Sequence, residues 1–190
     1  MMNDAYKKYH KPNMGPSAKT NQGYYKLENK EKYIGDPELI IYRSSWEFAF
    51  CRYCDMAPSV LRWSSEPISI PYYDRVSKLE ECVKLGLNPN DPANWEVRKY
   101  NTDFWYETDN GDGTTEKLFI EIKPSYKLKK PIPPAPDALL KDQRKFNQAA
   151  KEYLINEAKF AAINEWAARN RCKFYVFTEI TLEKILGKFL

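Results

Sequence analysis

The chain has 190 residues, of which 43% are apolar and 15% aromatic, and it carries a net charge of +4. A chain of this length can bury a sizeable core, so we expect one domain, or one domain with appendages. No apolar run approaches the roughly 18 residues that cross a bilayer, and no signal-peptide core follows Met1. We therefore expect a soluble, intracellular protein with no membrane partner.

The single histidine, His10, lies in a polar, lysine-rich leader. A Ser-His-Asp triad needs a positioned imidazole, and an HExxH zinc site needs two. Nucleases of the HNH, HUH and phospholipase-D types also need a histidine in their core. If this chain is a hydrolase, its chemistry must rest on carboxylates, lysines and a metal ion, and we expect no small-molecule cofactor.

Only two of the four cysteines, Cys51 and Cys54, have the CxxC spacing of a metal-binding pair. No second pair and no histidine lie near them, which argues against a closed zinc site. Their apolar surroundings predict packed thiols, and a reducing compartment disfavours disulfides.

The positive charge is concentrated at the start of the chain. Residues 1–35 hold seven lysines against three acidic residues, whereas residues 36–190 balance to zero. Prolines and glycines punctuate residues 1–33, which predicts a basic extended arm ahead of a folded domain at 34–190. This arm either contacts phosphate groups or is simply solvated.

The first predicted helix begins at a capping box. Ser44 and Glu47 have the Ser-x-x-Glu spacing, which predicts a helix that runs to about Met56 and stops before Pro58. Apolar alternation over residues 60–76 then predicts a strand or a hairpin.

Residues 77–96 are expected to be an insertion between strands. Ser77 and Glu80 form a second capping box, which opens a short helix that Gly86 closes. The rest of the segment is rich in Asn, Asp and Pro, which is typical of a loop.

Two β-prone segments flank a strong turn signal. Residues 99–106 are aromatic, residues 109–113 read Asp-Asn-Gly-Asp-Gly, and residues 118–122 are apolar, so together they predict a hairpin. Residues 124–136 contain five prolines and three lysines, which predicts an extended linker.

The remainder of the chain is predicted to form a helix, a strand and a short helix, at residues 137–170, 174–180 and 182–186. Asp137 can cap the long helix. Its apolar stripe consists of Phe146, Ala150, Leu154, Ala158 and Ala161. The element order is therefore helix, three strands, helix, strand, helix, which is an α/β arrangement.

A turn centred on Asp112 determines which residues of the hairpin face each other. Residues equidistant from the centre pair, so Asp103 faces Glu121, with Cα atoms about 4.5–5.5 Å apart and side chains on one face. Lys123 lies on that face too, about 6.6 Å further along the strand. A bulge would shift this register.

Two facing carboxylates repel each other, and a divalent cation between them resolves the conflict. Mg²⁺ accepts one or two carboxylates, with water and substrate phosphate completing its shell. Lys123 could orient or help deprotonate a water, or neutralise charge in the transition state. The alternative is that Asp103, Glu121 and Lys123 form the polar, solvent-facing side of an ordinary hairpin.

Longer motifs surround this pair. They are Tyr42–Glu47, Trp63–Glu66, Ile70–Tyr72, Glu121–Pro124 and Phe177–Glu179. In this order they resemble the TnsA-type endonuclease N-terminal domain of the PD-(D/E)xK superfamily. With the lead-in at residues 32–37, they more narrowly resemble the head-completion nucleases of T-even-like tailed phages. The resemblance implies a restriction-endonuclease-like α/β core: a helix, a three-stranded antiparallel meander, a helix and a strand, preceded by the basic N-terminal arm.

The resemblance also implies roles for individual residues. Asp103 and Glu121 would be metal ligands, Lys123 the catalytic lysine, and Glu47 an additional acidic residue of the metal site. Glu47 has a second interpretation, as the capping residue of its helix, and both roles can coexist.

Further residues are expected to contact DNA. Arg43 and Ser45 would contact the phosphate of the scissile strand, although Arg43 has the alternative of pairing with an acidic neighbour. Lys127, Lys129 and Lys130 either follow the DNA backbone or keep a proline-rich linker solvated.

Two positions depart from the family pattern. Thr102 stands where the superfamily usually has proline, and Glu121 stands where TnsA-type transposase subunits often have glutamine. Glu66 fits a family motif without an assigned role.

The resemblance implies a Mg²⁺- or Mn²⁺-dependent DNA endonuclease. It would process packaged double-stranded DNA beside phage portal or neck proteins, in the host cytoplasm during assembly or at the head–neck region of the virion. Two alternatives stay open: a non-catalytic neck protein that retains a nuclease fold, and a repair or homing-type endonuclease.

Overall fold

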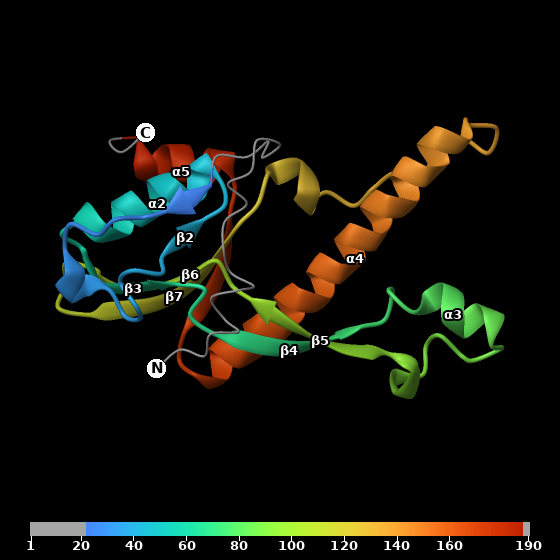
Figure 1. The fold of residues 1–190 in the computed structure, drawn as a ribbon, viewed down its shortest axis with the longest axis horizontal. Helices are drawn as coiled ribbons and strands as arrows, with labels where there is room; N and C mark the ends of the chain where they lie inside the picture. Colours follow the sequence, from blue (N-terminus) through green and yellow to red (C-terminus); the bar gives the residue numbers. More distant parts are fainter. Residues whose placement is uncertain (1–21, 188–190) are drawn as a thin grey trace. The chain divides into compact units, whose positions relative to one another are not determined.

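The computed structural model describes residues 22–187 (Figure 1). The elements are, in chain order, β1 (Gly23–Tyr24), η1 (Lys30–Lys32), β2 (Ile41–Tyr42), α2 (Ser45–Met56), β3 (Val60–Ser65), β4 (Ser69–Asp74), α3 (Leu79–Lys84), η2 (Pro92–Asn94), β5 (Glu96–Asn101), β6 (Phe104–Asp109), β7 (Thr115–Ile122), η3 (Ser125–Leu128), α4 (Leu140–Arg169), β8 (Lys173–Phe177) and α5 (Glu179–Leu186). None of the helices within residues 22–187 has the length and apolarity to cross a membrane.

The chain packs into two compact units, and each is assembled from separate stretches of sequence. Of the described residues, unit 1 takes 22–68, 102–122 and 171–187. Unit 2 takes residues 69–101 and 123–170. The α/β character that the sequence predicts is confirmed.

Unit 1 is built on a four-stranded sheet with the order β3-β6-β7-β8. The pairs β3–β6 and β6–β7 are antiparallel, and β8 pairs with β7 in parallel. The strands β3, β6 and β7 are therefore adjacent and antiparallel, but they are not consecutive in the chain, because β4 and β5 come between β3 and β6. Figure 1 shows α2 and α5 side by side along this sheet.

Aromatic side chains from α2 and the sheet form the core of unit 1. Phe50 of α2 is fully buried, and its ring centroid lies 4.9 Å from that of Phe104 and 5.8 Å from those of Tyr106 and Phe177. Such edge-on aromatic pairs add about 0.5–1.5 kcal/mol each beyond the burial of their area. The helix is therefore fixed against the middle of the sheet.

Part of the predicted arm proves to be packed. Tyr25 and Leu27 are buried, and the fully buried Asp55 of α2 accepts hydrogen bonds from the Tyr25 hydroxyl (3.0 Å), Glu28 N (2.8 Å) and Asn29 N (2.9 Å). The expectation of an irregular arm to residue 33 was wrong for residues 22–33, because alternating aromatic and aliphatic side chains there reach the core. Residues 1–21 of the arm lie outside the described part of the chain.

Unit 2 contains an antiparallel ribbon of β4 and β5, paired from Ser69↔Asn101 to Asp74↔Glu96. The expected single strand over 99–106 was wrong, since the backbone changes partner at Thr102 and Asp103 between β5 and β6. The segment 60–76 likewise forms two strands that join different sheets.

The predicted capping box at Ser77 was also wrong. Its hydroxyl donates to Asp74 (2.6 Å), and α3 begins two residues later with no side-chain cap. Burial would raise the pKa of Asp74, but hydrogen bonds from Ser77, Val76 and Arg98 hold it below its usual range. Gly86 closes α3 at a φ of 66°, as predicted.

The long helix α4 differs from its prediction in two respects. Leu139, not Asp137, is the residue at its N-cap, and no side chain caps it. The buried residues of α4 are Ile163 and Ala167, whereas Leu154 of the predicted stripe is 38% exposed. The predicted linker contains the short helix η3. The strand predicted at 174–180 is β8 at 173–177, and the helix predicted at 182–186 is α5, which begins at residue 179.

The cysteines agree with their prediction as packed thiols. Cys51 and Cys54 are fully buried, and burial is the main reason why the pKa of each thiol is raised well above its usual value. Such thiols are poor nucleophiles and poor metal ligands.

Candidate active site

Four segments of unit 1 converge at one end of the sheet. Because antiparallel neighbours run in opposite directions, the end of β3, the start of β6 and the end of β7 lie at the same edge, and β8 ends there too. Glu66 follows β3 directly, Asp103 precedes β6, and Glu121 is the penultimate residue of β7. The topology thus gathers acidic residues that are up to 55 positions apart in sequence.

The predicted register of the β6–β7 hairpin is confirmed. Phe104 pairs with Ile120 and Asp109 with Thr115, so continuing the ladder by one position places Asp103 opposite Glu121. The Asp103 side chain adds a hydrogen bond ahead of the start of β6, because its Oδ2 accepts a hydrogen bond from the backbone N–H of Ile122 at 2.7 Å. Glu121 is only 3% exposed, so this carboxyl group sits inside the protein rather than on a solvated face.

Lys123 immediately follows β7, two residues after Glu121, and is half-buried. The boundary between the two units falls between Ile122 and Lys123. The position of Lys123 beside the acidic pair therefore rests on its place in the sequence.

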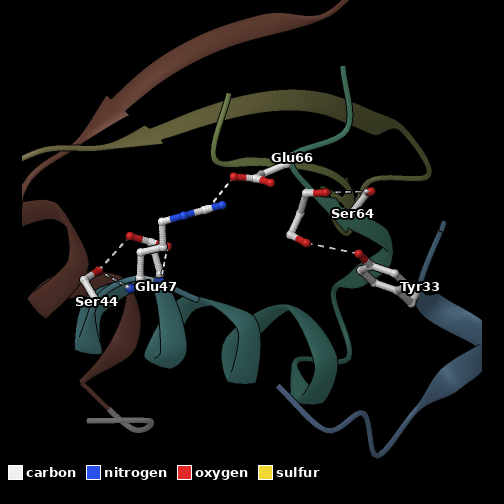
Figure 2. A network of polar contacts seen from close by, with 7 residues as sticks. Tyr33, Ser44, Glu47, Ser64 and Glu66 are labelled. Atoms are coloured by element: carbon white, nitrogen blue, oxygen red, sulfur yellow. Dashed lines mark hydrogen bonds and ion pairs between the residues drawn. The ribbon is translucent and has the colours of Figure 1, made fainter. Parts of the chain in front are cut away.

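Glu47 forms the predicted capping box with Ser44 at the start of α2, which is one of its two expected roles. The Ser44 hydroxyl donates to its Oε1 (2.9 Å), Arg43 N donates to its Oε2 (2.7 Å), and its own N–H donates to Ser44 Oγ (3.1 Å). Burial raises the pKa of Glu47, and these hydrogen bonds oppose the rise. Figure 2 shows this cap beside the guanidinium that reaches Glu66.

Arg43 pairs with Glu66, so its second interpretation, pairing with an acidic neighbour, holds in this structure (Figure 2). The Glu66 side chain is 16% exposed, and its backbone N–H donates to the carbonyl of Asp103 (2.9 Å). Glu66 also has a φ of +45°, which is uncommon for a residue with a side chain and recurs at functional sites.

A continuous series of contacts therefore joins the candidate residues. It runs from Glu47 to Arg43, from Arg43 to Glu66, and from Glu66 through the backbone to Asp103 beside the end of β7. The sequence motif around Glu66 assigns no role to this residue. In the structure Glu66 is the residue that connects the helix cap to the acidic hairpin.

A metal centre of three or more His, Cys, Asp and Glu side chains is not present among residues 22–187. The acidic pair Asp103 and Glu121 still matches what Mg²⁺ accepts, because this ion binds through one or two carboxylates and fills its shell with water and phosphate oxygens.

The residues expected to contact DNA have different environments. Ser45, the first residue of α2, is exposed. Lys127 forms an ion pair with Glu152 in unit 2, whereas Lys129 and Lys130 are exposed. The structure thus places Arg43 and Ser45 in unit 1 and the three lysines in unit 2.

An apolar cavity of about 400 Å³ opens beside Glu66. Tyr33, Ser65, Trp105 and Phe119 contribute to its lining, and the Tyr33 hydroxyl and Ser65 Oγ are 3.1 Å apart. The cavity therefore gives Glu66 a largely apolar flank that is open to solvent.

Comparison with known proteins identifies the family. Residues 57–179 match the model of the TnsA-like endonuclease N-terminal domain. The chain belongs to this family. It is also 30% identical over 157 residues to the head completion nuclease of Enterobacteria phage T4, an alignment that covers 83% of this chain and 90% of that protein. The matched segment of the family model contains Glu66, Asp103, Glu121 and Lys123, while Arg43 and Glu47 precede it.

Proposed function

We propose that the chain is a metal-dependent DNA endonuclease that acts in the completion of phage heads. The observation that carries the proposal is the placement of Asp103 opposite Glu121, at the end of a hairpin inside the segment that matches an endonuclease family. The similarity to a phage head completion nuclease supports the biological setting.

Asp103 and Glu121 would hold the cation, Mg²⁺ or Mn²⁺, with Glu47 as a further acidic residue at the same end of the unit. A bound divalent cation would polarise a phosphodiester and neutralise the charge that develops on it. Glu121 suits this role because its carboxylate is shielded from solvent, and Asp103 suits it because the N–H of Ile122 fixes its orientation.

Lys123 supplies a positive charge two residues beyond Glu121. Its ammonium group can orient a water molecule for attack on the phosphate or neutralise the pentacovalent transition state. Arg43 and Ser45 would bind the scissile phosphate. A guanidinium has five N–H donors, so the ion pair of Arg43 with Glu66 is compatible with a phosphate contact on its other edge.

The substrate would be packaged double-stranded DNA near the portal or neck, and the partners would be neck proteins of the particle. Lys129 and Lys130 would follow the DNA backbone, with Lys127 contributing when it exchanges Glu152 for phosphate. The protein would act during assembly in the host cytoplasm and remain at the head–neck region.

A second candidate, a non-catalytic neck protein with a nuclease fold, is favoured by one observation. In residues 22–187 the acidic side chains do not gather into a group of three that could hold a metal ion, and Glu47 is engaged as a helix cap. A two-carboxylate site answers this objection, since Mg²⁺ needs no third carboxylate.

A plasmid-nicking assay distinguishes the two. Wild type, Glu121→Gln and Lys123→Ala are compared with Mg²⁺, Mn²⁺ or EDTA, and Glu116→Gln and Lys117→Ala on the same strand are the matched controls. Nicking that needs the metal, vanishes in the first two variants and persists in the controls supports the endonuclease. Folded wild-type protein that never nicks, or nicks equally in EDTA, supports the structural candidate.

A further inference from the structure

The first half of α4 has no fully buried side chain. The buried side chains of the helix, Ile163 and Ala167, both lie in its last two turns, while Leu140 at the start is 70% exposed. Most helices in proteins are stabilised by burying an apolar face, and the charged residues of this half do not follow from such packing.

Four exposed cations lie on one side of this half, namely Lys141, Arg144, Lys145 and Lys151. At 3.6 residues per turn they fall within an arc of about 120°. The acidic residue within that arc, Glu152, is engaged by Lys127 and by Gln148 (3.1 Å), and these hydrogen bonds hold its pKa below the usual range. Its charge is therefore compensated, and the face is strongly positive.

The local charge equals that of the whole chain. Residues 127–152 contain seven Lys and Arg against two Asp and one Glu, a net charge of +4, and the complete chain also carries +4. All the remaining residues together therefore balance to zero. A positive potential concentrated on one helix and the segment before it is the electrostatic footprint of a polyanion site.

The same side of α4 is apolar where it packs. In the second half, Ile163 is buried there, and Lys159 lies over the rings of Tyr72 and Tyr100, 5.7 and 5.4 Å from their centroids. Near the end of the helix this side contacts the β4–β5 ribbon, whereas near the start it carries exposed cations. A helix that packed against its own chain throughout would have continued the apolar pattern.

We propose that this cationic face of α4, residues Lys141, Arg144, Lys145 and Lys151, binds the sugar–phosphate backbone of double-stranded DNA. The proposal rests on the proposed endonuclease function and adds a binding surface to it. From Lys141 to Lys151 the helix rises about 15 Å, which matches the rise of roughly four base pairs at 3.4 Å each. Between Lys141 and Lys151 the arc holds no aromatic side chain, so this stretch lacks the stacking platforms that single-strand binders use.

The test measures binding of the full chain to a fluorescent 30-base-pair duplex in EDTA, across a series of salt concentrations, by fluorescence anisotropy. The variant carries Lys141→Gln, Arg144→Gln, Lys145→Gln and Lys151→Gln. The matched control loses the same charge from other surfaces through Lys26→Gln, Arg52→Gln, Lys84→Gln and Lys184→Gln, all exposed positions. Circular dichroism confirms that both retain the helix content of the wild type.

Each released phosphate contact lowers the slope of log Kd against log salt by about 0.9, so the α4 variant should lose about 3–4 units of slope. The control should lose less than one unit. Equal slopes for wild type and the α4 variant would overturn the proposal, as would an equal loss in the control, because net charge alone would then explain the binding. Because cleavage is not measured, these results are independent of the nicking assay, which tests the endonuclease itself.

Discussion

The acidic end of unit 1 and the first half of α4 use charged residues in opposite ways. Around the sheet, Arg43, Glu47, Glu66 and Asp103 are each tied to a backbone group or to one another. On α4 the four cations stand exposed on one face of the helix. Chemistry on a phosphodiester requires atoms held in position, whereas binding a uniform polyanion requires charge density over a length of surface.

The largest expected difference between the regions concerns activity. Glu121→Gln should reduce nicking at least ~100-fold, because even the outer partners of metal ligands are worth about 10–100-fold. Removing the four cations of α4 should leave the rate at saturating DNA within a few-fold of the wild type and raise the apparent KM. Single-turnover nicking over a range of DNA concentrations checks this. A large loss of saturated rate in the α4 variant would contradict the division between the regions.

The next largest expected difference between the two regions is in the free energy of unfolding that a truncated side chain costs. Phe50→Ala should destabilise unit 1 by about 3–5 kcal/mol, because it leaves a cavity among three aromatic rings. Leu154→Ala on α4 should cost less than about 1 kcal/mol, since that side chain is 38% exposed. Urea unfolding followed by circular dichroism measures both. Similar costs for the two variants would mean that α4 is packed more tightly than its exposure indicates.

The buried carboxylate Asp55 gives a smaller effect. Asp55→Ala removes the acceptor of three hydrogen bonds from Tyr25, Glu28 and Asn29, and we expect a loss of about 1–3 kcal/mol. Hydrogen exchange should show faster opening of residues 25–29 in this variant. The exposed Asp109→Ala is the matched control, and exchange at residues 25–29 that is unchanged by Asp55→Ala would contradict the anchoring role.

The smallest predicted effect depends on pH. The pKa of Asp74 is lowered by hydrogen bonds from Ser77, Val76 and Arg98 that outweigh its burial, so its ionised form stabilises the ribbon above the ordinary aspartate value near 3.8. That stabilisation is lost as the pH falls through the lowered pKa. The difference in urea midpoint between wild type and Asp74→Asn should therefore be constant from pH 7 to about 5 and shrink at lower pH. A difference that grew on acidification would have the wrong sign.

The sequence predicted local features well where one signal dominated. The Asp-Asn-Gly-Asp-Gly turn determined the hairpin register, and through it the pairing of Asp103 with Glu121. The Ser44–Glu47 spacing likewise located the start of α2. Turn and cap chemistry acts over a few residues, so the amino-acid pattern alone contains the information.

The errors came where distant residues decide the outcome. Ser77 has the spacing of a cap, but a buried Asp74 nearby offers its hydroxyl a better acceptor. The aromatic run at 99–106 gave no sign that its two halves join different sheets. The role of Glu66 also depends on Arg43, 23 positions earlier, and on a backbone bond to Asp103. Such contacts are set by tertiary packing, which a local pattern does not encode.

The cations of α4 show a different limit. Their spacing is present in the sequence, but the apolar stripe of the same helix predicts a packed helix instead. Only the exposure of the first half of α4 reveals that the charged side is uncovered. Residue periodicity therefore locates a face, and the structure decides whether that face is covered.

The central claim is that Asp103 and Glu121 together hold a divalent cation. Titration of Mn²⁺ into the full chain, followed by isothermal calorimetry without DNA, tests it most directly in wild type, Asp103→Asn, Glu121→Gln and the control Glu116→Gln. The account predicts one site per chain in wild type and in the control, and its loss in both other variants. Binding that is unchanged in Asp103→Asn and Glu121→Gln, or no binding in wild type, would contradict it.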